Sequence, residues 1–405
     1  MAAPLDGVRV IEIDSWMAAP SAGALLADLG ADVIKIEPPG GDPMRGNQRP
    51  AKVDSGFKDY DLQFDVDNRG KRSIVVALDT DEGVAVAHRL VASAQVFMCN
   101  LLIQRQQKYR LDPASLFGIN PHLVHATLTG YGTTGPDAWR PGYDVTAFFG
   151  RSGLYDAMRE GEGGTVPMAR PAQGDHTTGL AMLGSILAAL RLMERTGEGQ
   201  VVETSLYETA VWTQASDYGV TAVDNAPVRR RARHEMLTIT GNRFPCGDGK
   251  WVVFNMMDKG ASNGCAAPSA REEWLTDERF RDASSRYRNM RALVEGVDAA
   301  LAAKSRDEWG VIFDKAGLIW GPVLTLDEVS RDPHAHAIGL FPEIEHPELG
   351  RYRTVNAPFR FATADVRPRG SAPTVGANTR AILAEAGYTE AEIQRLQGSG
   401  AIGAA

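Results

Sequence analysis

The first third of the chain alternates short apolar runs with longer segments in which apolar residues recur at helical spacing. The apolar runs predict buried strands at Val8–Ile13, Val33–Ile36, Ser73–Leu78, Val96–Met98 and Leu123–Leu128. Between them, Ala18–Leu29 and Asp81–Ala94 have the spacing of helices. Strands that alternate with helices predict a mainly parallel sheet covered by helices, so we expect an α/β, Rossmann-like domain.

The pattern changes after residue 178. Gly179–Glu194 predicts a long helix that ends at Gly197, and Val201–Ser205 predicts one more strand. Asp248-Gly249 lies between two short β-type runs and predicts a hairpin. Charged helices are expected up to about residue 317, and a final helical region is expected over Thr379–Leu396.

Composition narrows the class of protein. The chain has 405 residues, which favours more than one domain. Its net charge of −8 argues against a general nucleic-acid binder. We find neither a signal peptide nor about 20 consecutive apolar residues, so no membrane span is expected. Three widely spaced cysteines are typical of a reducing compartment, and we predict a cytoplasmic protein without a metal cluster.

Several common catalytic motifs are missing from the sequence. There is no P-loop, no HExxH, no GxSxG and no complete GxGxxG after the first strand. That strand continues instead into Asp14-Ser15-Trp16-Met17-Ala18. The missing glycine fingerprint argues against an NAD-dependent dehydrogenase.

Asp175 belongs to the most unusual local group, Gln173–Gly179, which directly precedes the long apolar helix. One interpretation is a plain helix cap, in which Asp175 or Thr177 accepts hydrogen bonds from free backbone N–H groups. The other is a nucleophilic carboxylate at a helix N-terminus, beside glycines that let a large ligand approach. Local sequence does not choose between them.

A wider set of motifs resembles the family III CoA-transferases, the CaiB/BaiF group that contains formyl-CoA and carnitine CoA-transferases. Residues 4–46 are similar to that family's first βαβ unit. Further similarities follow in the expected order: Gly70–Ile74, Leu128–Gly132 with Gly135-Pro136, Gly142–Asp144, Gly174-Asp175 with Gly179, Thr196–Val202, Gly321–Val323, Asp332-Pro333 and Ala357–Phe359. Each motif is weak alone, but their common order is specific.

The resemblance implies a function for Asp175. In that family the aspartate of the Gly-Asp motif is the nucleophile, and it forms an aspartyl–acyl anhydride and then an aspartyl-CoA thioester. The resemblance also places an oxyanion-binding backbone N–H at Met17. Coenzyme A and a carboxylic acid are the implied substrates, and no metal is required.

Further residues fall at positions that hold CoA in the family: Trp16, Met17, Ala18, Asn100, Lys108, Gly142, Tyr143 and Asp144. Each of three has a plainer interpretation as well. Lys108 resembles a solvated helix charge, Asn100 a turn residue, and Tyr143 a core aromatic.

The sequence also departs from the family. Leu101–Arg105 lacks the usual glycine and proline after the asparagine, and Lys259–Gly264 is the nearest candidate for the family's glycine-rich loop. The basic run Arg229–Arg233 predicts a solvated face more readily than an anion site. For His176, next to the proposed nucleophile, we favour a capping or packing role.

The resemblance further implies an architecture. Residues 1–205 and 325–405 would build the large Rossmann-like domain, residues 226–320 a smaller α+β domain, and residues 206–225 and 321–324 the linkers. Family members form interlocked homodimers, so a homodimer is expected.

Two other functions stay open. An α-methylacyl-CoA racemase resembles this chain, but its catalytic histidine would fall at Tyr143, and tyrosine is a poor base at neutral pH. A CoA-binding protein without turnover is the second alternative, which the intact Gly174-Asp175 motif disfavours.

Overall fold

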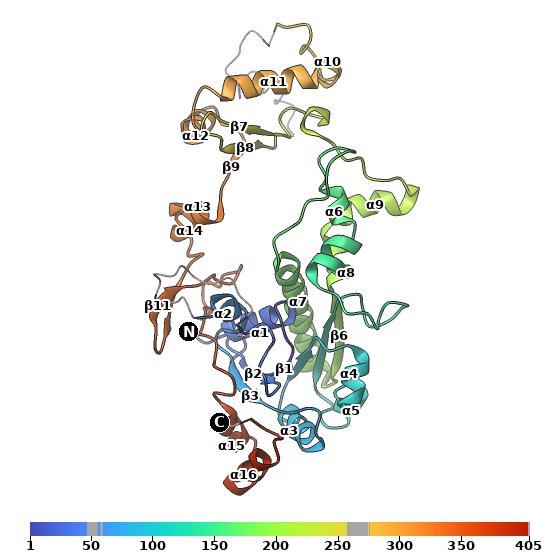
Figure 1. Cartoon of the computed structure of the whole chain (residues 1–405), viewed down its shortest axis with the longest axis vertical. Helices are drawn as coiled ribbons and strands as arrows, with labels where there is room; N and C mark the ends of the chain where they lie inside the picture. Colours follow the sequence, from blue (N-terminus) through green and yellow to red (C-terminus); the bar gives the residue numbers. More distant parts are fainter. Residues whose placement is uncertain (47–55, 57–59, 257–273, 275, 404–405) are drawn as a thin grey trace. The chain divides into compact units, whose positions relative to one another are not determined.

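The computed structural model describes residues 1–46, 56, 60–256, 274 and 276–403, and the chain divides into two compact units (Figure 1). The first unit comprises Met1–Leu154, Met168–Val220 and Ile338–Ala405. The second comprises Tyr155–Pro167 and Thr221–Ala337.

These units differ from the predicted domain bounds at Tyr155–Pro167 and at residues 325–337, which we had assigned to the large domain, and the predicted linker 206–225 is divided between the units. Ion pairs are the physical reason at both places: Arg230 binds Asp156 and Glu162, and Glu328 binds Lys250 and Arg306. The basic run is therefore not simply a solvated face: Arg233 also pairs with Asp298 inside the second unit.

Six parallel strands form the sheet of the first unit, as the alternating pattern predicted, in the order β3-β2-β1-β4-β5-β6. The strands are β1 (Arg9–Ile13), β2 (Asp32–Glu37), β3 (Arg72–Val75), β4 (Val96–Cys99), β5 (Val124–Thr129) and β6 (Gln200–Ser205). The order reverses between β1 and β4. In sheets of this type the crevice at the carboxyl ends of the strands, at that switch point, is where ligands bind.

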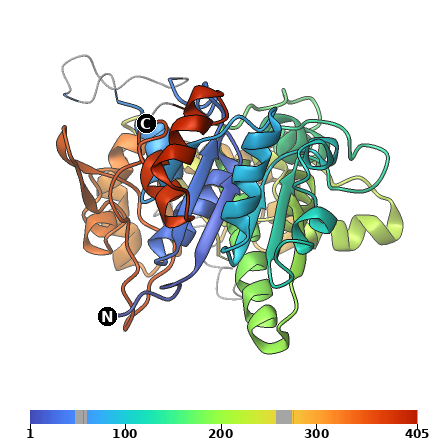
Figure 2. The same ribbon diagram turned by 90° about the horizontal axis from the view of Figure 1, so that it is seen from below.

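Helices from both ends of the sequence cover one face of this sheet (Figure 2). They are α3 (Asp81–Val91), α5 (Pro113–Phe117), α15 (Thr379–Glu385) and α16 (Glu390–Gly398). The helical region expected over Thr379–Leu396 is present as two helices, because Gly387 adopts a φ of +80° and Thr389 caps a new helix. After α16 the chain returns to the sheet, where Ile402 forms an isolated antiparallel bridge with Val76.

The opposite face carries α1 (Ala18–Asp28) and α2 (Leu62–Asn68), and α7 (Gln173–Thr196) packs against α1. Every residue of α1 is buried, and small side chains let it approach the sheet closely. At Gly23 an added Cβ would lie 2.0 Å from Oε2 of Glu12 on β1. The remaining helices of the first unit are α4 (Ile103–Lys108), the π-helix η1 (Asp144–Arg151), α6 (Leu154–Ala157, which continues into the second unit), α8 (Leu206–Thr213), and α9 (Ala215–Asp224, which also continues into the second unit).

Helix α7 is long and apolar enough to cross a membrane by length and composition alone, which we had not expected of any segment. One such helix is weak evidence for a membrane span. Its buried residues recur at helical spacing and form one stripe: Gly174, Thr178, Gly179, Met182, Leu183, Ile186, Ala189 and Leu190. This is the pattern of a helix that packs on one face of a protein core.

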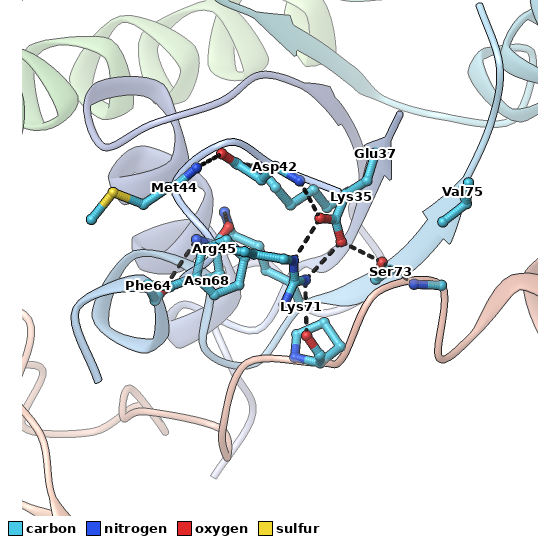
Figure 3. A network of polar contacts seen from close by, with 12 residues as sticks. Lys35, Glu37, Asp42, Met44, Arg45, Phe64, Asn68, Lys71, Ser73 and Val75 are labelled. Carbon is cyan, nitrogen blue, oxygen red and sulfur yellow. Dashed lines mark hydrogen bonds and ion pairs between the residues drawn. The ribbon is translucent and has the colours of Figure 1, made fainter. Parts of the chain in front are cut away.

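Buried charged side chains, among them Lys35, Glu37, Asp42 and Lys71, lie together near β2 and β3 (Figure 3). The fully buried Lys35 donates to Oδ1 of Asp14 at 2.8 Å and lies 3.1 Å from Oδ2 of Asp42. Lys71 lies 2.7 Å from Glu12, which also faces Lys35 at 3.5 Å. Burial, and then the charge of Asp14, raise the pKa of Glu12 to about 7.

A small antiparallel sheet, β7-β8-β9, organises the second unit. Its strands are β7 (Arg243–Pro245), β8 (Trp251–Phe254) and β9 (Trp320–Val323), so the predicted hairpin is confirmed. Aromatic side chains, including Phe244, Phe254 and Phe313, dominate its core. The accompanying helices are η2 (Arg233–Glu235), α10 (Ala283–Arg288), α11 (Met290–Leu301), α12 (Arg306–Lys315), α13 (Leu326–Val329) and α14 (Pro333–Ala337). A further hairpin, β10 (Glu343–His346) with β11 (Gly350–Arg353), belongs to the first unit.

The buried lysine makes a sharp prediction for stability. Lys35→Met would leave the Asp14 and Asp42 carboxylates buried without their cation, which costs about 3–5 kcal/mol in comparable cases. We expect a large fall in the urea-unfolding midpoint. Lys304→Met is the control, because Lys304 is exposed and its loss should change stability by less than about 0.5 kcal/mol. Similar midpoints for the two variants would contradict the assigned role of Lys35.

Candidate active site

The turn between β1 and α1 is held in an unusual conformation. Trp16 has a φ of +68°, in the left-handed region that costs a non-glycine residue about 1–2 kcal/mol. Its backbone N–H donates to Oδ1 of Asp42 at 3.2 Å, and Lys35 donates to the Asp14 carbonyl at 3.1 Å. The buried charges described above therefore fix the backbone that leads to Met17, the residue that precedes α1.

Asn100 holds the same turn from the other side of the switch point. Its Nδ2 donates to the Ser15 carbonyl at 2.7 Å, and its Oδ1 accepts from the Ser15 N–H at 3.2 Å. Asn100 follows β4, so this pair joins the carboxyl ends of β1 and β4. Asn100 therefore does stabilise a turn, but the turn belongs to the segment after β1 and not to its own segment.

A cavity of about 420 Å³ opens at the carboxyl ends of the first four strands. Its lining comes from the segments that follow them: Ile13–Ser15, Ile36–Pro39 with Pro43, Val76–Asp79, Asn100-Leu101, and Arg105 with Tyr109. Among the predicted CoA-binding residues, Asn100 lines this cavity. It is the crevice that the strand order predicts for a ligand.

Arg105 supplies the positive charge among the residues that line this cavity, whereas the family pattern pointed to Lys108. Arg105 lies one turn before Lys108 on α4, and Lys108 itself is exposed, with its ammonium 5.2 Å from the ring of Tyr109. The family pattern pointed to a basic residue on this helix, but sequence alone could not tell which turn of it faces the cavity.

Asp175 lies in the first turn of α7, and it does not cap the helix. The helix begins at Gln173, after Ala172, which has a φ of +78°. The carboxylate that fixes this start is Asp144, whose Oδ2 accepts the Ala172 N–H at 2.8 Å. Asp144 is only 4% exposed and also accepts the Val145 N–H at 2.6 Å, so it acts as a support beneath the site.

Glycines bring the surrounding backbones close together. An added Cβ at Gly174 would lie 2.7 Å from the Phe148 ring, and one at Gly179 would lie 2.8 Å from the Ala18 carbonyl oxygen. Gly179 comes one helical turn after Asp175, on the same face of α7. Asp175 therefore lies on the side of α7 that faces the start of α1, near Met17 and Ala18. At Gly142, an added Cβ would similarly meet the ring of Tyr131 at 2.9 Å.

Tyr143 and Trp16 contact each other at this place. Their rings meet edge to face with centroids 5.8 Å apart. Tyr143 is 54% exposed and precedes η1, so the interpretation of it as a core aromatic is wrong. Two residues predicted to hold CoA are thus brought together, beside the strained turn.

The electrostatic surroundings of Asp175 are unfavourable for its charge. Burial, and then the nearby carboxylate of Asp144, raise the pKa of Asp175 to about 7. A helix N-terminus alone would favour the ionised carboxylate, so burial and Asp144 outweigh the helix here. A desolvated carboxylate is more reactive once it is ionised, because water no longer stabilises its charge.

His176, the next residue, is paired rather than capping the helix. Its Nε2 lies 2.9 Å from Oδ1 of Asp67 on α2. Asp67 is 2% exposed, whereas the side chain of His176 is 45% exposed. No local pattern predicts this pair, because 109 positions of sequence separate its members.

Sequence comparisons relate the chain to known CoA-transferases. The model of CoA-transferase family III matches residues 5–379. The chain is 30% identical over 399 residues to an (R)-2-hydroxy-4-methylpentanoate CoA-transferase of Clostridioides difficile, covering 98% of each chain. It is 31% identical to a cinnamoyl-CoA:phenyllactate CoA-transferase of Clostridium sporogenes, covering 96% of this chain and 95% of that one.

A solved structure has the same fold. The crystal structure of a CaiB/BaiF family protein from Brucella suis superposes with a TM-score of 0.83 at 30% identity, covering 95% of this chain and all of that one. The chain therefore belongs to CoA-transferase family III.

The close contact between α7 and α1 can be tested with two glycines of the same helix. Gly179→Ala places a Cβ 2.1 Å from Oγ of Ser21 and 2.8 Å from the Ala18 carbonyl, so it should cost about 1–3 kcal/mol and move Asp175 away from the turn. Gly184 has no atom within 4 Å of an added Cβ, so Gly184→Ala should stabilise the helix by about 0.5–1 kcal/mol. Thermal unfolding and the rate of CoA transfer, measured on both, should diverge. Equal behaviour would exclude the close-packing argument.

Proposed function

We propose that the chain transfers coenzyme A from an acyl-CoA to a carboxylic acid, with Asp175 as the covalent nucleophile. The observation that carries this proposal is the place of Asp175 in the first turn of α7, one turn before Gly179, where α7 packs against Ala18 at the start of α1. Membership in family III supports the same reaction.

The reaction would proceed through four acyl transfers. The Asp175 carboxylate attacks the thioester carbonyl, which gives a mixed anhydride and releases the CoA thiolate. The thiolate attacks the aspartyl carbonyl, which gives an aspartyl-CoA thioester and releases the donor acid. The acceptor carboxylate then attacks this thioester, which gives a second mixed anhydride and releases the CoA thiolate. The thiolate attacks the acceptor carbonyl of that anhydride. The new acyl-CoA leaves, and the Asp175 carboxylate is restored.

Each transfer passes through a tetrahedral oxyanion that needs donors already in place. The first N–H groups of a helix have no partner within it, and the backbone at Met17 and Ala18 begins α1 beside Asp175. The bonds from Asp42, Asn100 and Lys35 keep the preceding turn rigid, so these N–H groups need little reorganisation.

Coenzyme A would extend from this point into the cavity at the strand ends. Arg105 would bind its phosphates, since a guanidinium matches phosphate geometry. Asn100 lies between the cavity and the turn, and Trp16 with Tyr143 would contact the pantetheine arm.

The names of relatives suggest which acids to test first. The two relatives named above act on hydroxy acids by name, and others are named for glutarate and citramalate. A panel of 2-hydroxy acids and dicarboxylic acids, with their CoA thioesters as donors, therefore covers the nearest chemistry.

The decisive experiment is intact-protein mass spectrometry after incubation with this panel, with hydroxylamine trapping. We expect an adduct or hydroxamate on Asp175, and none in Asp175→Ala. Exchange of the α-proton with solvent deuterium, without any adduct, would instead indicate a racemase. CoA binding with neither signal would indicate a binding protein without turnover.

We also propose a homodimer. Helix α9 buries none of its residues, and its Val223 is 83% exposed. Trp212, on the preceding helix α8, is 77% exposed, so this chain leaves apolar side chains uncovered. In size-exclusion chromatography with light scattering we expect twice the chain mass of 43.7 kDa, unchanged on dilution to micromolar concentration. A monomer under those conditions would overturn the dimer.

A further inference from the structure

The pair of His176 and Asp67 lies beside the nucleophile, and the reaction as written does not use it. Asp67 is almost fully buried on α2, and its second oxygen, Oδ2, has no hydrogen-bond partner among the described residues. His176 reaches it at 2.9 Å from the first turn of α7. Packing alone does not account for a half-exposed histidine that is paired with a buried carboxylate next to the proposed nucleophile.

Negative charge surrounds Asp175 from two elements. Asp144 on η1 is buried against the start of α7, and Asp67 on α2 lies on the side of His176. Both raise the pKa of Asp175, after burial itself. From α1, the residues that contact α7 at Gly179 are Ala18 and Ser21, which carry no charge.

His176 directly follows Asp175 in the first turn of α7 and supplies a positive charge beside it. Burial lowers the pKa of His176, but the hydrogen bond and charge of Asp67 raise it more, so the net pKa is above its ordinary value. Arg69, at the end of α2, is a second cation nearby, but it forms two bonds with Asp28, at 2.7 and 3.2 Å. The charge of His176 lowers the pKa of Asp175.

We propose that His176, held as an imidazolium by Asp67, is a positioning residue for the transfer reaction, which keeps Asp175 in the ionised form that attacks the thioester. The inference rests on the proposed function of Asp175. It adds that the nucleophile operates in a balance of charges, in which one cation opposes two buried carboxylates.

The test is the pH dependence of adduct formation on Asp175, and of kcat/KM, in charge variants of His176. His176→Gln keeps a hydrogen-bond donor for Asp67 but has no charge. We expect its acid limb to move upward by about one pH unit, which is a tenfold lower rate on that limb, and to converge with wild type at high pH. His176→Lys restores a cation and should keep the acid limb near that of wild type.

His334→Gln is the matched control, because His334 is exposed and lies in the second unit, and it should leave the profile unchanged. If His176→Gln does not fold, His176→Ala gives the same readout, since alanine is the best helix former at a half-exposed position.

Three outcomes separate the possibilities. An upward shift in Gln that Lys rescues supports the role of His176. An unmoved acid limb in His176→Gln, or an equal loss of rate in His176→Gln and His176→Lys at every pH, overturns the role of His176. The proposed function still stands in that case if wild type forms the Asp175 adduct. No adduct on wild-type Asp175 at any pH overturns both.

Discussion

The ion cluster around Lys35 is the constraint on which the site depends. One ammonium, fully removed from water, contacts Asp14 and Asp42 and also binds the Asp14 carbonyl. Asp42 in turn accepts the N–H of Trp16. A single buried cation thus connects the second strand to the turn that begins α1. Such clusters are poor stabilisers compared with an apolar core, but they demand one geometry, because every displaced partner leaves a desolvated charge.

The fixed geometry of this ion cluster explains why Trp16 keeps a left-handed backbone conformation just before α1. A strained backbone residue survives only where its neighbours determine its conformation. Here three side chains hold the turn that contains Trp16: the carboxylate of Asp42, the amide of Asn100 and the ring of Tyr143. The proposed oxyanion-binding backbone is consequently prepared before any substrate arrives, which is the condition under which such donors are most effective.

Much of the fold could be predicted from sequence, because apolar runs and helix spacing are local signals. All six parallel strands fall where the apolar pattern placed them, and the start of α7 was predicted only six positions too late. The error at α7 has a physical cause: the helix start is fixed by Asp144, which is distant in sequence from Ala172. The same limit applies to the pair of His176 and Asp67 and to the choice between Arg105 and Lys108, since pairing and facing depend on tertiary structure. The segment Lys259–Gly264, our candidate for the family's glycine-rich loop, lies outside the described residues, so that prediction stays open.

The return of the last residues to the first sheet has a consequence for how the protein is made. The core of the first unit includes Ile382, Leu383, Ile393 and Leu396, which a ribosome delivers about 300 residues after the strands they cover. The core of the second unit lies within Ile239–Trp320, so it leaves the ribosome complete while the first sheet still lacks part of its cover. During synthesis, the sheet that holds the candidate site therefore keeps part of one apolar face uncovered until the last helices of the chain have been made.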